Sequence, residues 1–280
     1  MYVLAIETTG AFASVALMKD GEVIGHIAGN DRFSHLQNLM PQIRQVTVDN
    51  QLTISDVNAV AVSCGPGSFT GIRIGVSTAR ALAQVMDIPC VAVSSLEALA
   101  MRADGKQAEA PADHERSTTP ADLEKHTPPA EPEKSRTLIC PILDARRSQV
   151  YGGGYYLEDG YPVEEIKAAP YTIEEFMAAV SGYDNVLLLG DAADVCSDKI
   201  MQLRPKGVRT ASEDIRYQDA VTVGKLGCRL LEETGGVKYY DVKPEYMRLA
   251  EAERKLREQQ SARSTQGSQL SQEQQAEQKG

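Results

Sequence analysis

The chain opens with short apolar runs separated by turn residues. Residues 2–7, 12–18 and 22–28 are rich in Val, Ile and Ala, and they are separated by Gly10 and by the Lys-Asp-Gly triplet at 19–21. An Asp-Gly pair between apolar runs is a strong hairpin signal. These positions therefore predict an antiparallel meander of three strands at the start of the fold.

The apolar pattern then changes to the period of a helix. Leu36, Leu39, Met40, Ile43 and Val46 lie on one helical stripe. The residues beyond them predict buried strands over 59–63 and 90–93, a helix over 70–86, and a further helix from Leu96. A meander followed by strands joined through helices predicts a mixed sheet with helices packed on its faces.

The same order of elements returns in the second half of the chain. Apolar runs predict strands over 138–143, 149–157, 161–168, 186–189 and near Val208, and helices over 173–180, 192–203 and 220–233. Both halves read β-β-β-α-β-α-β-α, which indicates an internal duplication. We interpret the fold class as α/β, with two ribonuclease-H-like domains of the actin, sugar kinase and Hsp70 (ASKHA) class.

The stretch between the two halves has a different composition. Residues 103–136 are dominated by Pro, Glu, Ala, Thr and Lys, with almost no large apolar side chains. Such a segment cannot bury enough surface to order itself. We expect a first domain over 1–102, a disordered insertion over 103–136, a second domain over 137–249 whose last helix could pack back on the first, and a polar tail over 250–280.

Composition narrows the classes of function. The net charge of -10 argues against a chain that binds nucleic acid without another subunit, because phosphate binding needs clustered Lys and Arg. Five widely spaced cysteines without a C-x-x-C pair indicate small buried thiols, not a zinc site or a disulfide framework. We expect a cytoplasmic protein, since the start lacks a signal-peptide pattern and no apolar run approaches the ~20 residues of a membrane helix.

The first motif with possible chemistry follows the first strand and reads Ala5-Ile6-Glu7-Thr8-Thr9-Gly10. In two-domain nucleotide-binding proteins, an acid at this place helps to hold metal, and the backbone N–H groups of a small turn approach phosphate. Glu7 and Thr8 are the candidates for these roles. The same residues also fit a tight hairpin with a capping acid.

The second copy of this motif departs from a phosphate turn. Arg146 and Arg147 follow Asp144, where glycine would let the backbone meet an anion. Gly190 is followed by Asp191, where a second glycine would admit the adenosine of a nucleotide. The sequence therefore predicts a nucleotide-binding fold that has lost its nucleotide site, with no cofactor and no metal. The remnants of that site are Glu7, Thr8, Asp144, Arg146, Gly190 and Asp191.

The third motif, over 64–75, reads Cys-Gly-Pro-Gly-Ser-Phe-Thr-Gly-Ile-Arg-Ile-Gly and lacks the Gly-Lys-Ser/Thr ending of a phosphate loop. The helix that it begins has a ridge of small residues and a second apolar face, formed respectively by Gly75, Ala79 and Ala83 and by Ile74, Ala81 and Val85. A helix that is apolar on two faces is either deeply buried or shared between its own core and a partner.

These motifs together closely resemble the signature of the TsaB family. The resemblance centres on residues 65–75 and on Val91-Ala-Val-Ser-Ser-Leu-Glu-Ala-Leu99. Further matching stretches are Leu4-Ala-Ile-Glu-Thr-Thr9, Ser34-His35, Leu143-Asp-Ala-Arg-Arg147 and the ten residues from Pro244 to Glu253. The resemblance covers most of 2–101 and 138–255.

The resemblance implies a non-catalytic subunit of the complex that makes N6-threonylcarbamoyladenosine (t6A) in tRNA. It implies pairing with the catalytic paralogue TsaD and with the ATPase TsaE, and contact with tRNA only through the complex. The TsaD relatives hold metal through a His-x-x-x-His pair. Here Leu39 stands four residues after His35, in the place of the second histidine, so no metal site carries over.

In the family, helices that correspond to the stretch from His35 to Val46 and to 70–86 form the heterodimer. The candidates for interface and core, which the sequence does not separate, are Leu36, Leu39, Met40, Ile43, Ile72, Ile74, Val76, Ala79 and Ala83. Arg73 fits a polar interface anchor or a solvated arginine equally well. An exposed apolar helix face also predicts a weak homodimer when the partner is missing. The rival hypotheses are a self-sufficient actin-class ATPase or kinase and a homodimeric chaperone-like regulator.

Overall fold

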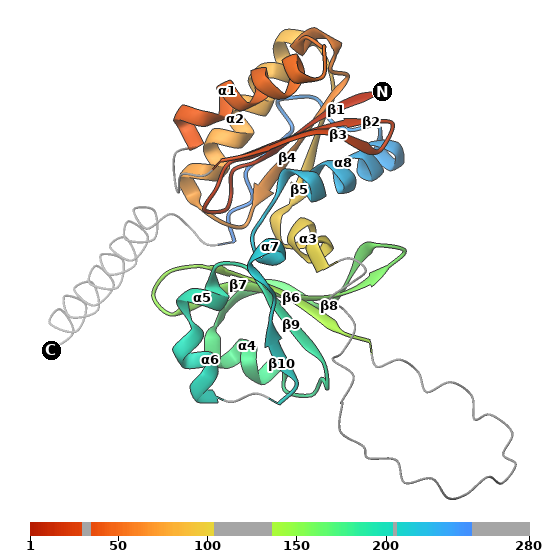
Figure 1. Cartoon of the computed structure of the whole chain (residues 1–280). Helices are drawn as coiled ribbons and strands as arrows, with labels where there is room; N and C mark the ends of the chain where they lie inside the picture. Colours follow the sequence, from red (N-terminus) through yellow and green to blue (C-terminus); the bar gives the residue numbers. More distant parts are fainter. Residues whose placement is uncertain (30–34, 104–135, 204–205, 248–280) are drawn as a thin grey trace, which may run out of the picture. The chain divides into compact units, whose positions relative to one another are not determined.

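The computed structural model describes residues 1–29, 35–103, 136–203 and 206–247. Residues 1–245 form one compact unit that carries two five-stranded sheets (Figure 1). A second unit begins at Tyr246 and is described only at Tyr246 and Met247. The insertion expected over 103–136 lies outside the described residues except at its two ends, and the tail expected over 250–280 lies outside them altogether.

The first sheet has the strand order β3-β2-β1-β4-β5. Its strands are β1 (Tyr2–Glu7), β2 (Ser14–Lys19), β3 (Glu22–Ala28), β4 (Ala59–Gly65) and β5 (Cys90–Ser94). The central strand β1 pairs antiparallel with β2 and parallel with β4, so the sheet is mixed, as predicted. Asp20 and Gly21 both have positive φ, which is the geometry of the tight hairpin that the Asp-Gly pair predicts.

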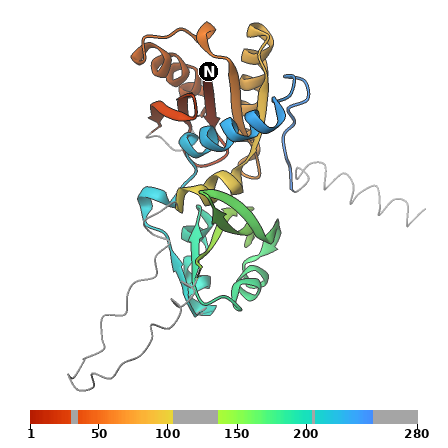
Figure 2. The ribbon, with the colours of Figure 1, turned by 90° about the vertical axis from the view of Figure 1, so that its right-hand side faces the viewer.

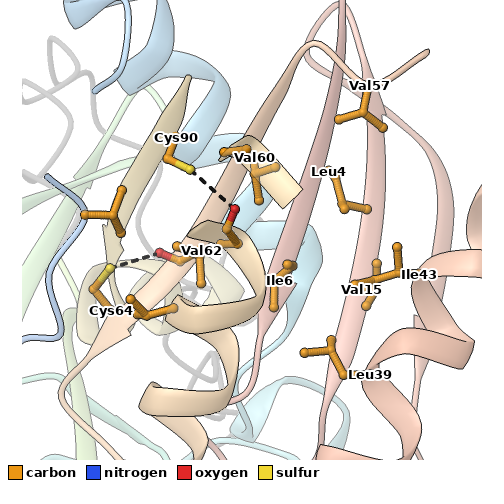
Figure 3. Packing of buried hydrophobic residues seen from close by; sticks show 14 of the residues in the cluster. Leu4, Ile6, Val15, Leu39, Ile43, Val57, Val60, Val62, Cys64 and Cys90 are labelled. Atoms are coloured by element: carbon orange, nitrogen blue, oxygen red, sulfur yellow. Dashed lines mark hydrogen bonds between the residues drawn. The ribbon is translucent and has the colours of Figure 1, made fainter. Parts of the chain in front are cut away.

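The two faces of this sheet contribute to two different cores. Leu4 and Ile6 of β1 belong to one buried cluster, whereas Val3 and Ala5 belong to the other. This is the period-two alternation of a strand that is buried on both faces. Figure 3 shows the first cluster, in which Leu39 and Ile43 lie over the strands.

Helices cover both faces of the first sheet (Figures 1 and 2). The helices α1 (His35–Asp49) and α2 (Phe69–Met86) pack on the first cluster, and α8 (Ala220–Thr234) packs on the second. Local caps explain where α2 and α8 begin. The Ser68 side chain accepts a hydrogen bond from the Gly71 N–H, and the Asp219 side chain accepts one from the Val221 N–H.

The second sheet repeats the topology of the first, with strand order β10-β9-β6-β7-β8. Its central strand, β6, pairs antiparallel with β7 and parallel with β9, as β1 pairs with β2 and β4. The strands are β6 (Leu138–Asp144), β7 (Gln149–Glu158), β8 (Tyr161–Thr172), β9 (Val186–Leu189) and β10 (Val208–Thr210). The duplicated α/β fold of the ASKHA class is therefore confirmed.

The three helices that follow β8 and β9 have eight residues or fewer, whereas α1 and α2 have 15 and 18 residues. Helix α4 (Ile173–Val180) follows β8, and the helix expected over 192–203 is divided at Cys196 into α5 (Ala192–Val195) and α6 (Ser197–Leu203). The short elements α3 (Ser95–Ala100), α7 (Glu213–Arg216) and the 3-10 turns η1 (Ile54–Asp56) and η2 (Met101–Ala103) complete the described secondary structure.

The segment after α8 covers the edge of the first sheet. Cys90 at the start of β5 and Val237 exchange two backbone hydrogen bonds of 2.8 Å. Val242 is buried in the first core cluster, and the Glu245 N–H donates to the Cys64 carbonyl at 2.8 Å. Covering an edge strand in this way removes a template for unwanted strand pairing. Within the described ranges, no helix is both long and apolar enough to cross a membrane.

Candidate functional site

The turn after β1 is filled by the chain's own carboxyl group. Glu7 is fully buried, and its Oε1 atom accepts hydrogen bonds from the Thr9 N–H at 2.5 Å, the Thr9 hydroxyl at 2.7 Å and the Gly10 N–H at 3.3 Å. The Ser63 hydroxyl donates to Oε2. Burial raises the pKa of Glu7, while these hydrogen bonds act in the opposite direction. The N–H groups that a phosphate would need are thus already used.

The loop before α2 closes the same turn from outside. The Ser68 N–H donates to the Thr9 carbonyl at 2.9 Å, and the Thr8 hydroxyl donates to the Gly71 carbonyl at 2.8 Å. A Cβ atom at Gly71 would lie 1.9 Å from the Thr8 carbonyl oxygen. The glycines of this motif therefore admit the chain's own backbone, where a phosphate loop would admit an anion.

The corresponding turn after β6 is closed by an ion pair. The Arg146 N–H donates to Asp144 Oδ1 at 2.7 Å, and the Arg146 guanidinium lies 3.1 Å from Asp144 Oδ2. Asp191 accepts a hydrogen bond from the Asp144 N–H at 2.9 Å. Burial, followed by the charge of Asp144, raises the pKa of Asp191. Gly190 fits tightly here, because a Cβ atom would lie 2.0 Å from the Ile142 carbonyl oxygen.

The predicted remnants of a nucleotide site therefore form two separate groups. Glu7 and Thr8 bond within the first half of the chain, and Asp144, Arg146, Gly190 and Asp191 gather in the second half. Among the described residues, no three His, Cys, Asp or Glu side chains are grouped so that they could hold a metal ion.

The candidate interface residues of α1 and α2 divide into buried and exposed sets. Leu39, Ile43, Ile72, Val76, Ala79 and Ala83 are buried in the first core cluster. Leu36 lies in α1, but its side chain is outside the described part of the structure. Met40 and Arg73 are exposed and Ile74 is half-buried. The ridge of small residues on α2 thus packs against the chain's own sheet.

Exposed apolar side chains nevertheless remain on both helices. Met40 and Val48 on α1 are 52% and 57% exposed, and Phe69 and Val85 on α2 are 37% and 86% exposed. We call these four residues, which lie at different points along the two helices, the α1–α2 surface. The guanidinium carbon of Arg73 lies 4.0 Å from the ring centroid of Phe69, a cation–π contact at the start of α2.

Comparison with known proteins places the chain in a family. It is 31% identical to the tRNA threonylcarbamoyladenosine biosynthesis protein TsaB of Bacillus subtilis (strain 168) over 91% of this chain and 97% of that protein. The chain belongs to the TsaB family. Over 91% of this chain and 98% of the relative, it is also 28% identical to the protein of the same name in Escherichia coli (strain K12).

Two further likenesses concern the fold and one part of the chain. The solved structure of YeaZ from Pseudomonas aeruginosa matches with a TM-score of 0.66 and 24% identity, over 88% of this chain and 99% of that chain, which shows a shared fold. Residues 25–113 match the family model described as TsaD: tRNA N6-adenosine threonylcarbamoyltransferase. That stretch includes α1 and α2.

Some residues of this TsaB-family chain take part in the site without having been predicted. Ser63, Ser95 and Gln218 surround the first turn: the Thr9 hydroxyl lies 2.9 Å from Ser95 Oγ, and a Cβ atom at Gly10 would lie 2.8 Å from Gln218 Oε1. They come from distant segments, so no local pattern could have found them. The exposed Val85 was visible as part of the second apolar face of its helix, but it could not be distinguished from core.

Proposed function

We propose that the chain is a non-catalytic subunit of the machinery that makes t6A in tRNA, pairing with a TsaD-like catalytic paralogue and with a TsaE-like ATPase. Membership of the TsaB family supports the pathway, since the relatives are named for threonylcarbamoyladenosine biosynthesis. One structural observation supports the non-catalytic role and the pairing. Both turns that could meet phosphate are occupied by the chain's own groups, while apolar side chains on α1 and α2 are exposed to solvent.

The α1–α2 surface is the proposed docking site for the TsaD-like partner. Full burial of a side chain as exposed as that of Val85 contributes about 1.5–3 kcal/mol of favourable free energy to binding. The match of 25–113 to the TsaD model supports a partner with an equivalent helix pair, so that two similar surfaces pack in a nearly two-fold arrangement. The same geometry accounts for a weak homodimer when the partner is missing.

The charge of the chain supports an indirect role toward tRNA. A net charge of -10 repels phosphates, so the partner subunits would supply most of the contact. In this proposal, the domain over 1–102 carries the partner surface. The domain over 137–249 stabilises it through α8, which packs on the first sheet.

Co-purification with the TsaD-like and TsaE-like proteins, with and without ATP, tests this proposal. Val85→Glu should weaken pairing with the TsaD-like protein at least tenfold, which corresponds to about 1.4 kcal/mol, because it places a charge in an apolar contact. Val195→Glu is the matched control, since Val195 is 65% exposed on α5 of the second half.

Two results would count against the proposal. Unchanged pairing of a folded Val85→Glu variant would remove the assigned surface. Tight magnesium-dependent binding of ATP with turnover by the isolated chain would favour the actin-class ATPase or kinase.

A further inference from the structure

The buried carboxyl of Glu7 is surrounded by hydrogen-bond donors that converge on it. Its donors are two backbone N–H groups, of Thr9 and Gly10, and two hydroxyl groups, of Thr9 and Ser63. Every one of these partners is a neutral group. Ser95 forms a second layer, with its Oγ atom 2.9 Å from Thr9 Oγ1 and 3.3 Å from Ser63 Oγ.

This arrangement has the chemistry of a site for a carboxyl group. Successive N–H groups of a turn, joined by hydroxyl donors, form a concave cradle for carboxyl oxygens. Here the occupant is covalently attached to the strand that leads into the turn. We propose that the β1–β2 turn is a built carboxyl-binding site that carries its own ligand, the Glu7 carboxyl, and that it takes up a small carboxyl compound, formate or its conjugate acid, when that carboxyl is removed.

The second half of the fold shows the same relation with an exposed partner for the acid. The N–H of Arg146 donates to Asp144 Oδ1, just as the N–H of Thr9 donates to Glu7, two residues after the acid in both cases. Asp144 also has the Arg146 guanidinium as a partner, and the Arg146 side chain is 79% exposed. In the first turn, Glu7 and Ser63 are fully buried and Thr9 is 2% exposed, so these donors have no access to water if the carboxyl is lost.

The occupied turn also holds the start of α2. Thr8 donates its hydroxyl to the Gly71 carbonyl, and the Thr9 carbonyl accepts the N–H of Ser68. An empty cradle should therefore loosen the first turn of α2 as well as lower the stability of the sheet. This inference concerns the turn itself and stands whether or not the α1–α2 surface binds the proposed partner.

The test is chemical rescue of a Glu7→Ala variant of the full chain. Thermal unfolding is measured in sodium formate and, at equal ionic strength, in sodium chloride. With a Kd of about 10 mM, formate at about 100 mM should raise the Tm by roughly 3–5 °C more than chloride does, along a saturable curve. Val62→Ala is the matched control, because Val62 precedes Ser63 on β4 and is fully buried in an apolar cluster. Its Tm should respond equally to the two salts.

Removing a donor should weaken the rescue. In the Glu7→Ala/Ser63→Ala double variant, the formate concentration for half of the effect should rise several-fold, since one of the donors is gone. A Glu7→Ala variant that responds to formate no more than to chloride would overturn the proposal. If that variant does not fold in either salt, a double-mutant cycle of Glu7→Gln with Ser63→Ala decides: coupling supports the cradle, and additive effects overturn it.

Discussion

Adding a single methyl group at Gly71 tests the closed first turn. The new Cβ atom would lie 1.9 Å from the Thr8 carbonyl oxygen and 3.0 Å from its carbon, whereas real Cβ atoms essentially never come within 3.0 Å of another heavy atom. Backbone must therefore move by about an ångström. This movement would also break the hydrogen bond from the Thr8 hydroxyl to the Gly71 carbonyl.

The magnitudes decide the sign of the effect of Gly71→Ala. Alanine favours a helix over glycine by about 1 kcal/mol. Overpacking costs about 1–3 kcal/mol or more, and a lost hydrogen bond costs about 1 kcal/mol. The variant should therefore be less stable by about 2 kcal/mol, which lowers the Tm by roughly 4–8 °C for a fold of this size.

Circular dichroism melting and urea unfolding measure the effect, with Gly182→Ala as the control. No heavy atom lies within 4 Å of the position that a Cβ would take at Gly182, so that variant should stay within about 0.5 kcal/mol of the parent. A Gly71→Ala variant as stable as the parent, or more stable, would show that helix propensity prevails. The close packing of the turn on α2 would then be refuted.

Four further changes test other parts of the structure. Burial raises the pKa of Glu7 above 4.5, so the stability that this group contributes below pH 4.5 is lost as the pH rises through its folded-state pKa. The free energy of unfolding of Glu7→Gln, measured in urea, should therefore increase relative to that of the parent from about pH 4 to 8. Burial raises the pKa of Asp219, but hydrogen bonding and charge from His26, together with the Val221 N–H and the charge of Arg102, hold that pKa below 3.8. Asp219→Asn should therefore be less stable than the parent at neutral pH, and this difference in the free energy of unfolding should disappear as the pH falls through that folded-state pKa. Ala79→Glu puts a charge at a fully buried core position, so loss of the folded circular dichroism spectrum, not a selective loss of pairing, is expected. Val242→Ala should lower the free energy of unfolding by about 1–3 kcal/mol, because Val242 anchors the segment over the sheet edge in the core.

Much of the fold could be predicted because its signals are local. Alternation along β1, the Asp-Gly turn at 20–21 and the helical stripe through Leu39 and Ile43 each depend on neighbouring residues, and each appears in the structure where it was expected. The division of the helix expected over 192–203 was not predicted, since its apolar pattern continues through Cys196.

The roles of the residues on α2 depend on packing that the apolar pattern alone does not contain. The ridge of Gly75, Ala79 and Ala83 has the spacing of a close helix contact, and the sequence leaves open whether the surface that it meets is a partner or the chain's own sheet. The structure places Ala79 and Ala83 in the first core cluster and leaves Val85 86% exposed.

The sequence by itself determined the duplicated α/β architecture, the resemblance to the TsaB family and the crowding of the second turn by Arg146. These are properties of periodicity and of residue type at a given position. Only the tertiary structure decided that Glu7 turns inward to fill its own turn, with Ser63 from a distant strand as a donor. It also decided which apolar face of α2 remains exposed. Both depend on which segments meet in space, because a hydrogen-bond partner or a buried contact is defined by proximity, and residues far apart in the chain become neighbours only when the sheet has formed.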